Sequence, residues 1–248
     1  MSVRRGDWVK RRNSEGVRGF ITFTHGPSAL VRWLGEGRGS WIGKRSLRLS
    51  SPPRALVLEG SLDSALHSRR SERDALQNWC DAAGIVLAFK AVHRIEDFEQ
   101  IVEALSRDRP PFVHIICHGN HDDDGRPYLL LAPRSKKGNR IYLDTSETHK
   151  AFRQCFGGHS VLFSACLVAK YERHIDSFRR SAHLRHVAAF SRTVYDDEAI
   201  LFDISLYHGI LSAGLTFPTA VARARDALAT LGVRGGIGRG QKLVKVFG

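Results

Sequence analysis

Pro111-Phe112-Val113-His114-Ile115-Ile116-Cys117-His118-Gly119-Asn120 is an apolar run of β-forming residues that ends abruptly in His-Gly. A second run, Ser160-Val161-Leu162-Phe163-Ser164-Ala165-Cys166, ends in a cysteine that lies 48 residues after His118. Both runs are typical of buried strands. Because ligands bind at the carboxyl ends of the strands in open α/β sheets, we expect His118 and Cys166 to meet at that edge.

Short strands and helices alternate along the rest of residues 55–248, which predicts an α/β fold. Further apolar runs indicate strands over residues 55–59, 85–89, 128–131, 141–143, 185–191 and 242–247, the last at a sheet edge. Apolar residues at helical spacing indicate helices over residues 64–83, 95–105, 146–156, 197–211 and 216–231. The order favours a mainly parallel sheet with helices on both faces.

Three of the segments between these elements have no regular pattern. Residues 120–126 are polar and acidic and predict a turn, and residues 132–140 predict a basic loop. Residues 167–183 show no clear periodicity and contain several Lys, Arg and His side chains. This last segment predicts a mobile loop beside the active edge.

Residues 1–50 have a different rhythm, with short β-type runs separated by glycines. The alternation and turn spacing resemble small SH3-like barrels, and the Ser-Pro-Pro-Arg segment at residues 51–54 indicates a linker to a second domain over residues 55–248. Trp8, Trp33 and Trp41 allow two interpretations. They fill a very small core, or they form an exposed aromatic face among arginines that would suit a nucleic acid or a peptide.

Positive charge is concentrated in the same N-terminal region. Of the net charge of +13, residues 1–50 supply +8, from 11 Lys and Arg against 3 Asp and Glu. The remaining residues contain 27 basic and 22 acidic side chains, a net charge of +5. Residues 1–50 are therefore a candidate nucleic-acid-binding region.

The cysteines and the apolar runs indicate the compartment. Cys80, Cys117, Cys155 and Cys166 form no CxxC pair and no pattern of a small disulfide-linked domain. No apolar run approaches the ~18–20 residues that a membrane span needs, and the first residues do not resemble a signal peptide. We expect a cytoplasmic protein with free thiols and without a membrane partner.

A histidine and a cysteine at one sheet edge can form a nucleophile–base pair. The cysteine attacks as a thiolate, and a neighbouring histidine can take its proton and later return it to the leaving amine. Gly119 has no Cβ, so its backbone can approach a bound carbonyl, and its N–H could hold the oxyanion. The N–H of Cys166 is the second oxyanion donor that we expect.

Residues 55–231 resemble caspase-fold cysteine peptidases, most closely the CHAT branch of the clan that also contains caspases, metacaspases, gingipains and separase. Three matches in order support this resemblance. They are the strand with His-Gly at residues 113–119, the strand with Ser-Ala-Cys at residues 161–166, and the Val-Tyr-Asp-Asp-Glu-Ala segment at residues 194–199 with the helices that follow it.

The resemblance implies a His118/Cys166 dyad and a protein substrate, without a metal or cofactor. It also implies a substrate pocket with an acidic residue after the catalytic cysteine, where Asp196 lies, with Asp197 as the second candidate. Such a carboxylate would favour cleavage after Arg or Lys, although Asp196 could instead cap the following helix. Prokaryotic members of the family often serve in regulated defence or cell-death systems. The resemblance implies a protease that is held inactive until a loop is cut or an activating partner protein docks.

The sequence departs from the family in two places, and two other functions stand as alternatives. Leu167 follows the cysteine where the family often has a Gly-containing turn, and the caspase Q-A-C-x-G pentapeptide is absent. The first alternative is a non-catalytic scaffold with a nucleic-acid- or peptide-binding N-terminal barrel. The second is a metallophosphoesterase, because residues 119–122 match the G-N-H-[DE] element of that class, although its other ligand motifs are missing.

Overall fold

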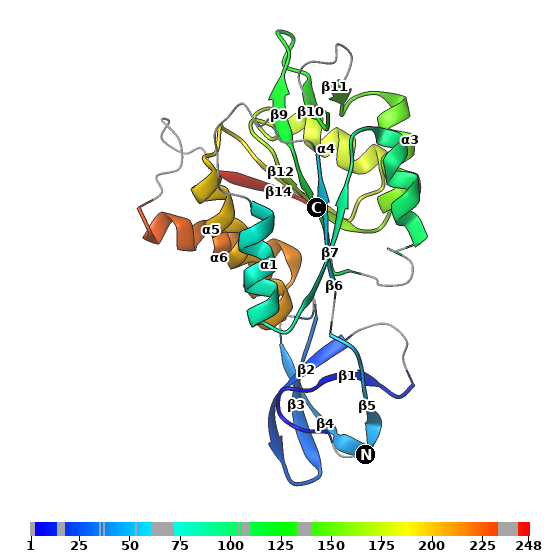
Figure 1. Ribbon diagram of the computed structural model, residues 1–248, viewed down its shortest axis with the longest axis vertical. Helices are drawn as coiled ribbons and strands as arrows, with labels where there is room; N and C mark the ends of the chain where they lie inside the picture. The colour runs from blue at the N-terminus through cyan, green and yellow to red at the C-terminus, as the bar shows by residue number, and fades with distance from the viewer. Residues whose placement is uncertain are drawn as a thin grey trace.

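The computed structural model describes residues 3–13, 18–34, 36, 38–52, 54–60, 72–103, 105, 110–132, 140–232 and 243–248. The described chain forms a small all-β region at the N-terminus, here called the β module (residues 3–52), below a larger α/β region (Figure 1). This arrangement confirms the predicted fold class. The assignment of the β module to the SH3-like class and the boundaries of the two predicted domains remain predictions.

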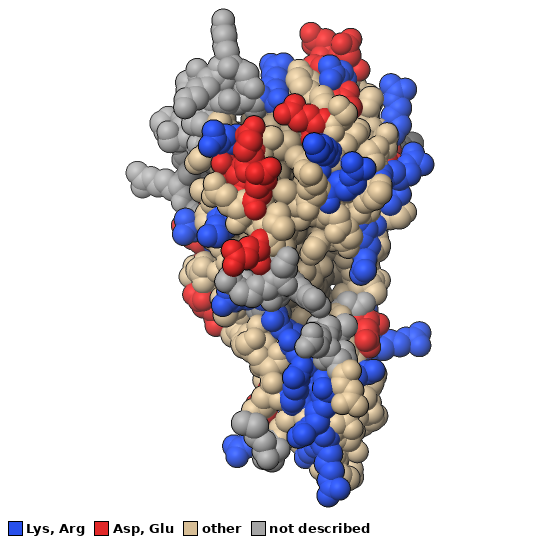
Figure 2. Space-filling model, turned by 90° about the vertical axis from the view of Figure 1, so that its right-hand side faces the viewer, with Lys and Arg blue, Asp and Glu red and all other residues tan. Residues whose placement is uncertain are grey.

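The β module is one antiparallel sheet of five strands in the order β4-β3-β2-β1-β5. Its strands are β1 (Trp8–Arg11), β2 (Arg18–His25), β3 (Ser28–Trp33), β4 (Gly39–Gly43) and β5 (Leu47–Leu49). A single turn of 3-10 helix, η1 (Lys44–Ser46), precedes β5. Lys and Arg side chains gather in a stripe over the visible face of the module (Figure 2).

The three tryptophans of the β module have different roles. Trp33 and Trp8 are buried, and Trp33 belongs to the core of the module. Trp41 is 54% exposed. The expectation that tryptophans fill the core is therefore right for two of them, and the expectation of an exposed aromatic side chain is right for the third.

The α/β region is built on a six-stranded sheet in the order β14-β13-β12-β8-β6-β7. Five strands are parallel: β6 (Arg54–Glu59), β7 (Val86–Ala91), β8 (Val113–Ile116), β12 (Ser160–Ser164) and β13 (His186–Phe190). The sixth, β14 (Val244–Phe247), pairs antiparallel with β13 at the edge, as its position at the end of the sequence predicted. The mainly parallel sheet is thereby confirmed.

Helices cover both faces of this sheet. Successive side chains of a strand point to opposite faces, and apolar side chains of the strands pack on each face. One face packs against η3 (Ile95–Ile101), α3 (Ser146–Phe156) and α4 (Glu172–Ser181). The other packs against α1 (Glu72–Ala82), α5 (Asp196–Tyr207), the π-helix η4 (His208–Ser212) and α6 (Phe217–Thr230). On β8, Val113 and Ile115 face the first group, and Ile116 faces the second.

A second small sheet extends the carboxyl edge of the main one. It contains β9 (His118–His121), β10 (Pro127–Leu130) and β11 (Arg140–Tyr142), with β10 in the middle and both pairings antiparallel. The turn predicted over residues 120–126 was therefore too long, because the first of these residues belong to β9. The side chains of β9 are polar, so the sequence contains no apolar pattern that would predict this edge strand.

Two further predictions of local structure were wrong or inaccurate. Residues 167–183 are not a loop throughout, because α4 occupies residues 172–181, with Ile175 and Phe178 buried in the core. So few apolar residues on a charged helix give no visible periodicity in the sequence. The helix predicted over residues 95–105 begins as the 3-10 helix η3. The first part of the helix predicted over residues 64–83 lies outside the described residues.

Five phenylalanines bind the α3 and α4 side of the core together. Phe152 lies at the centre, with ring centroids 5.0–5.9 Å from those of Phe178, Phe98, Phe156 and Phe163. These rings come from η3, α3, β12 and α4. Edge-to-face contacts of this kind stabilise a core beyond the burial of area alone.

We predict that Phe152→Ala lowers the free energy of unfolding by about 3–5 kcal/mol, because it leaves a cavity at the centre of this cluster. Leu231→Ala is the matched control, since Leu231 is exposed, and it should change the free energy by less than about 0.5 kcal/mol. Urea unfolding followed by circular dichroism measures both values. Equal effects of the two substitutions would contradict the central role of Phe152.

Candidate active site

The site begins with the pairing of two neighbouring parallel strands. In the register of β8 with β12, Ile116 lies beside Ser164. The residues that follow, Cys117-His118 and Ala165-Cys166, therefore leave the sheet at the same edge. This is the carboxyl edge, where α/β sheets bind their ligands.

Gly119 shows how closely the two chain segments approach. A methyl group at Gly119 would lie 2.6 Å from the carbonyl oxygen of Cys166 and 2.9 Å from the Cβ of Ala165. The His118–Gly119 backbone thus packs directly on the residues that present the cysteine. Any side chain at position 119 would push these segments apart.

Cys166 is the half-buried member of the four free cysteines, and the other three are buried. Its Sγ accepts a hydrogen bond from the Val194 N–H at 3.4 Å. Burial raises the pKa of the Cys166 thiol, the Val194 backbone lowers it, and the charges of Glu72 and Asp196 raise it further. The net direction is upward, so the thiol in the free chain keeps its proton at neutral pH.

The turn after the cysteine contains Leu167 in the left-handed region, with φ of 62°. This conformation costs a residue with a side chain roughly 1–2 kcal/mol and is the one that glycine adopts readily. The Leu167 N–H donates to the Arg192 carbonyl oxygen at 3.1 Å, which ties the turn to the segment after β13. The non-glycine residue noted in the sequence therefore sits in a backbone conformation that favours glycine.

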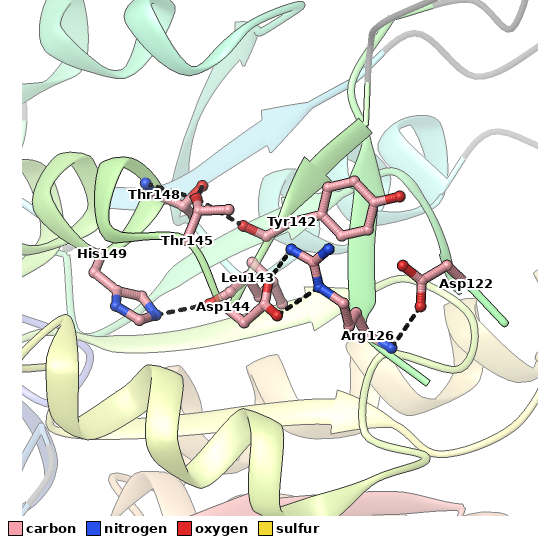
Figure 3. Close-up of polar contacts among 8 residues, drawn as sticks. All are labelled: Asp122, Arg126, Tyr142, Leu143, Asp144, Thr145, Thr148 and His149. Carbon is pink, nitrogen blue, oxygen red and sulfur yellow. Dashed lines mark hydrogen bonds and ion pairs between the residues drawn. The ribbon is translucent and has the colours of Figure 1, made fainter. Parts of the chain in front are cut away.

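His118 is half-buried and begins β9, where it pairs with Leu130 of β10. An ion pair links the turn between β9 and β10 to the turn between β11 and α3: Arg126 Nε lies 2.7 Å from Asp144 Oδ2, and Arg126 Nη2 lies 3.0 Å from Asp144 Oδ1 (Figure 3). The Arg126 N–H also donates to the Asp122 carboxylate at 2.8 Å and closes the turn after β9. Asp122 therefore has a structural role in this turn.

The start of α3 completes this support for the hairpin. Thr145 is the N-cap, and its hydroxyl oxygen accepts the Thr148 N–H at 3.2 Å. The His149 ring nitrogen Nε2 lies 2.9 Å from the Leu143 carbonyl oxygen, as Figure 3 shows. The His149 contact thus holds the turn that carries Asp144 against the first turns of α3.

The two candidate pocket residues lie together in the first turn of α5. Asp196 and Asp197 are both exposed. The charge of Asp196 contributes to the raised pKa of Cys166, so this carboxylate lies within electrostatic reach of the thiol. Glu198, not Asp196, accepts the Tyr195 N–H at the helix start, at 3.2 Å.

A polar cluster below Cys166, largely buried and with Glu72 at its half-buried end, was not recognised in the sequence. The Ser164 hydroxyl lies 3.0 Å from Glu72 Oε1 and 3.4 Å from Asp203 Oδ2. His114 Nε2 lies 3.4 Å from the same Asp203 oxygen, and His114 Nδ1 lies 3.1 Å from the Tyr207 hydroxyl. Ser164 precedes Cys166 by two residues, so the cluster lies under the turn that presents the thiol.

Burial sets the protonation of this cluster. It raises the pKa of Glu72 to about 7 and that of Asp203 well above its ordinary value, and it lowers the pKa of His114 to about 3. The contact between His114 and Asp203 is therefore one between neutral groups, not an ion pair. The signal in the sequence was a charged residue, Asp203, within the apolar run of residues 199–206.

The residues of the G-N-H-[DE] match lie in β9 and the turn after it. The His121 ring nitrogens contact the Asp122 carbonyl oxygen at 3.1 Å and Lys170 Nζ at 2.9 Å. His114 and Cys117, the other ligand types nearby, are buried. Within the described ranges, no three His, Cys, Asp or Glu side chains are grouped so that they could hold a metal ion.

We predict that iodoacetamide modifies Cys166 in the folded protein before Cys80, Cys117 and Cys155, because those three side chains are buried. The rate should rise with pH around a midpoint above that of an ordinary thiol, since burial and nearby carboxylates raise the pKa of Cys166. Glu72→Gln should move the midpoint to lower pH, because it removes a negative charge that disfavours the thiolate.

Peptide mapping by mass spectrometry measures the site and the rate. Glu96→Gln is the control, because Glu96 is an exposed carboxylate on η3, and this variant should keep the midpoint of the unchanged protein. A midpoint that is the same with and without the Glu72 charge would contradict the electrostatic coupling of the cluster to the thiol.

Comparisons with known proteins agree with this architecture. The model of the CHAT domain family matches residues 38–233, which are 196 of the 248 residues and begin before the predicted linker. No curated protein sequence matches the chain.

No described helix has the length and apolar character that crossing a membrane requires.

Among solved structures, the chain is similar to a secreted C11 cysteine protease from Bacteroides thetaiotaomicron, solved with an irreversible peptide inhibitor. The TM-score is 0.51 at 10% sequence identity, and the match covers 79% of this chain and 66% of the protease chain. At this identity, the likeness shows a shared fold. The family match and the shared fold together show that the chain belongs to the CHAT domain family and has the fold of caspase-like cysteine peptidases.

Proposed function

We propose that this chain is a cysteine endopeptidase in which Cys166 is the nucleophile and His118 the general base. The observation that carries the proposal is the packing of the His118–Gly119 backbone on Ala165–Cys166. This contact brings the two reactive residue types to one sheet edge from two strands. The family and the fold support the same assignment.

The proposed reaction follows from these groups. His118 accepts the Cys166 proton, and the thiolate sulfur bonds to the carbonyl carbon of the scissile peptide. The N–H groups of Gly119 and Cys166 hold the resulting oxyanion. His118 then gives its proton to the leaving amine as the C–N bond breaks. Water, deprotonated by His118, hydrolyses the thioester, which releases the carboxylate product and restores the thiol.

The charges around the thiol favour a substrate with a basic side chain at the cleavage position. The carboxylates of Glu72 and Asp196 disfavour the thiolate of Cys166. A bound Arg or Lys side chain would neutralise them and so lower the pKa of the thiol. Asp196 is the pocket residue that we propose, with Asp197 beside it, and binding of the correct substrate would itself activate the nucleophile.

The raised pKa of Cys166 also favours the alternative, in which the chain is a non-catalytic scaffold. A thiol that keeps its proton at neutral pH is a weak nucleophile unless a substrate or a partner protein changes its surroundings. The two functions differ in one measurable property, which is covalent capture of a peptide electrophile by Cys166.

We predict that Cys166→Ala and His118→Ala each lower kcat/KM for peptide cleavage at least about 10³-fold, because each removes a member of the dyad. Cys155→Ala removes a buried thiol elsewhere and should retain cleavage. An acyloxymethyl ketone peptide ending in Arg should label Cys166 faster than one ending in Leu or Asp. Cleavage that survives in Cys166→Ala would contradict the assignment.

We predict that Asp196→Asn lowers kcat/KM for peptides with Arg at the cleavage position about 10- to 100-fold, since it removes one partner of a charge-assisted hydrogen bond. Cleavage of a peptide with Leu at that position should change little. Asp197→Asn is the matched control on the same helix turn. A larger loss in Asp197→Asn would transfer the pocket role to that residue.

A further inference from the structure

The β module has a cleft whose lining is basic and aromatic. The cleft has a volume of about 530 Å³ and lies where the end of β1, the end of β4 and η1 meet. Its charged lining residues are Arg11, Arg12 and Arg45, and Trp41 stands at its side. None of the described residues that line the cleft is acidic.

The β module that contains the cleft is positively charged as a whole. Residues 1–50 supply +8 of the net charge of +13. Figure 2 shows the Lys and Arg side chains of the module as a stripe along one face. A polyanion that follows this stripe would meet several cations in succession.

An exposed aromatic platform adjoins the charged cleft. Across β2, β3 and β4, the register places Phe23 beside Leu30 and Leu30 beside Trp41. Phe23 is 51% exposed and Trp41 is 54% exposed, and their ring centroids lie 6.1 Å apart. Large aromatic side chains outside the core expose apolar surface to water, which is unfavourable. A flat ligand that stacks on the two rings would cover this surface.

We infer that the β module is a binding site for single-stranded nucleic acid, with phosphates along the arginines of the cleft and bases stacked on Trp41 and Phe23. Aromatic side chains beside a basic groove are the two elements that single strands need. A duplex keeps its bases stacked internally and could not use the platform. An acidic peptide would use the arginines and would leave the aromatic pair without a matching partner.

This inference is independent of the proposed peptidase activity. It rests on charges and exposed rings of the β module, and the dyad residues take no part in it. A protein without peptidase activity could therefore still bind the strand, and a peptidase could still fail to bind it.

The test uses the full chain and a fluorescein-labelled 12-nucleotide oligo(dT), with binding followed by fluorescence anisotropy between 50 and 200 mM KCl. We expect binding that weakens with salt. Trp41→Ala should weaken binding about tenfold and Trp41→Phe should largely restore it, because the truncated side chain no longer stacks on a base. Arg45→Glu should weaken binding and reduce the slope of log K against log salt by roughly 0.7 for each phosphate that the variant no longer binds.

Two matched controls repeat these changes away from the module. Arg153→Glu reverses an exposed charge on α3, and Tyr195→Ala removes an exposed aromatic side chain before α5. Both should bind the oligonucleotide as the unchanged protein does. The inference is overturned if the controls lose as much affinity as the module variants. It is also overturned if a 12-base-pair duplex binds as tightly as oligo(dT), or if only a polyglutamate peptide binds.

Discussion

The parallel pairing of β8 with β12 is the constraint on which the rest of the site depends. Hydrogen-bonded neighbouring strands lie about 4.8 Å apart, so the chain segments that follow them start close together. The register that places Ile116 beside Ser164 therefore sends His118 and Cys166 over the same edge. A glycine at position 119 is what lets the first segment settle on the second, because a methyl group there would overlap the Cys166 carbonyl oxygen. The proposed proton transfer from Cys166 to His118 requires this contact, because without it the two side chains would not lie at the same place.

The site also contains features that are unfavourable for stability alone. Leu167 adopts a left-handed backbone conformation directly after the cysteine, and acidic groups raise the pKa of the thiol. Below it, Ser164, Glu72 and Asp203 form a polar cluster within an otherwise apolar layer. Strain and buried polar groups of this kind cluster at functional sites, where the surrounding structure holds them in place. The opposite face of the sheet contains the phenylalanine cluster and is packed with apolar side chains. This core stabilises the fold and so holds the unfavourable features of the site in place.

The β module and the candidate active site occupy opposite ends of the main sheet (Figure 1). The parallel strands direct their carboxyl ends towards β9 and β10, whereas the module meets the α/β region at the loop after η4. There, a methyl group on Gly214 would lie 3.0 Å from the Trp33 carbonyl oxygen. A strand of nucleic acid on the module would therefore leave the proposed dyad accessible. The two proposed functions can coexist in one chain because the sheet separates them.

The sequence by itself determined the alternation of strands and helices, the mainly parallel sheet and the two strand ends that present His118 and Cys166. These features follow from local patterns, such as apolar runs of strand length. The bounds of α3, residues 146–156, also agree with the prediction, because Thr145 and Gly157 mark the ends of the helix. Only the tertiary structure decided that α4 is a helix, that β9 is a strand, and that Glu72 and Asp203 meet below the thiol. In each case, the stabilising contact comes from another element of the fold: Phe152 of α3 against Phe178 of α4, β10 against β9, and Ser164 of β12 between two carboxyl groups. The residue pattern within one element cannot contain a contact whose partner belongs to a different element.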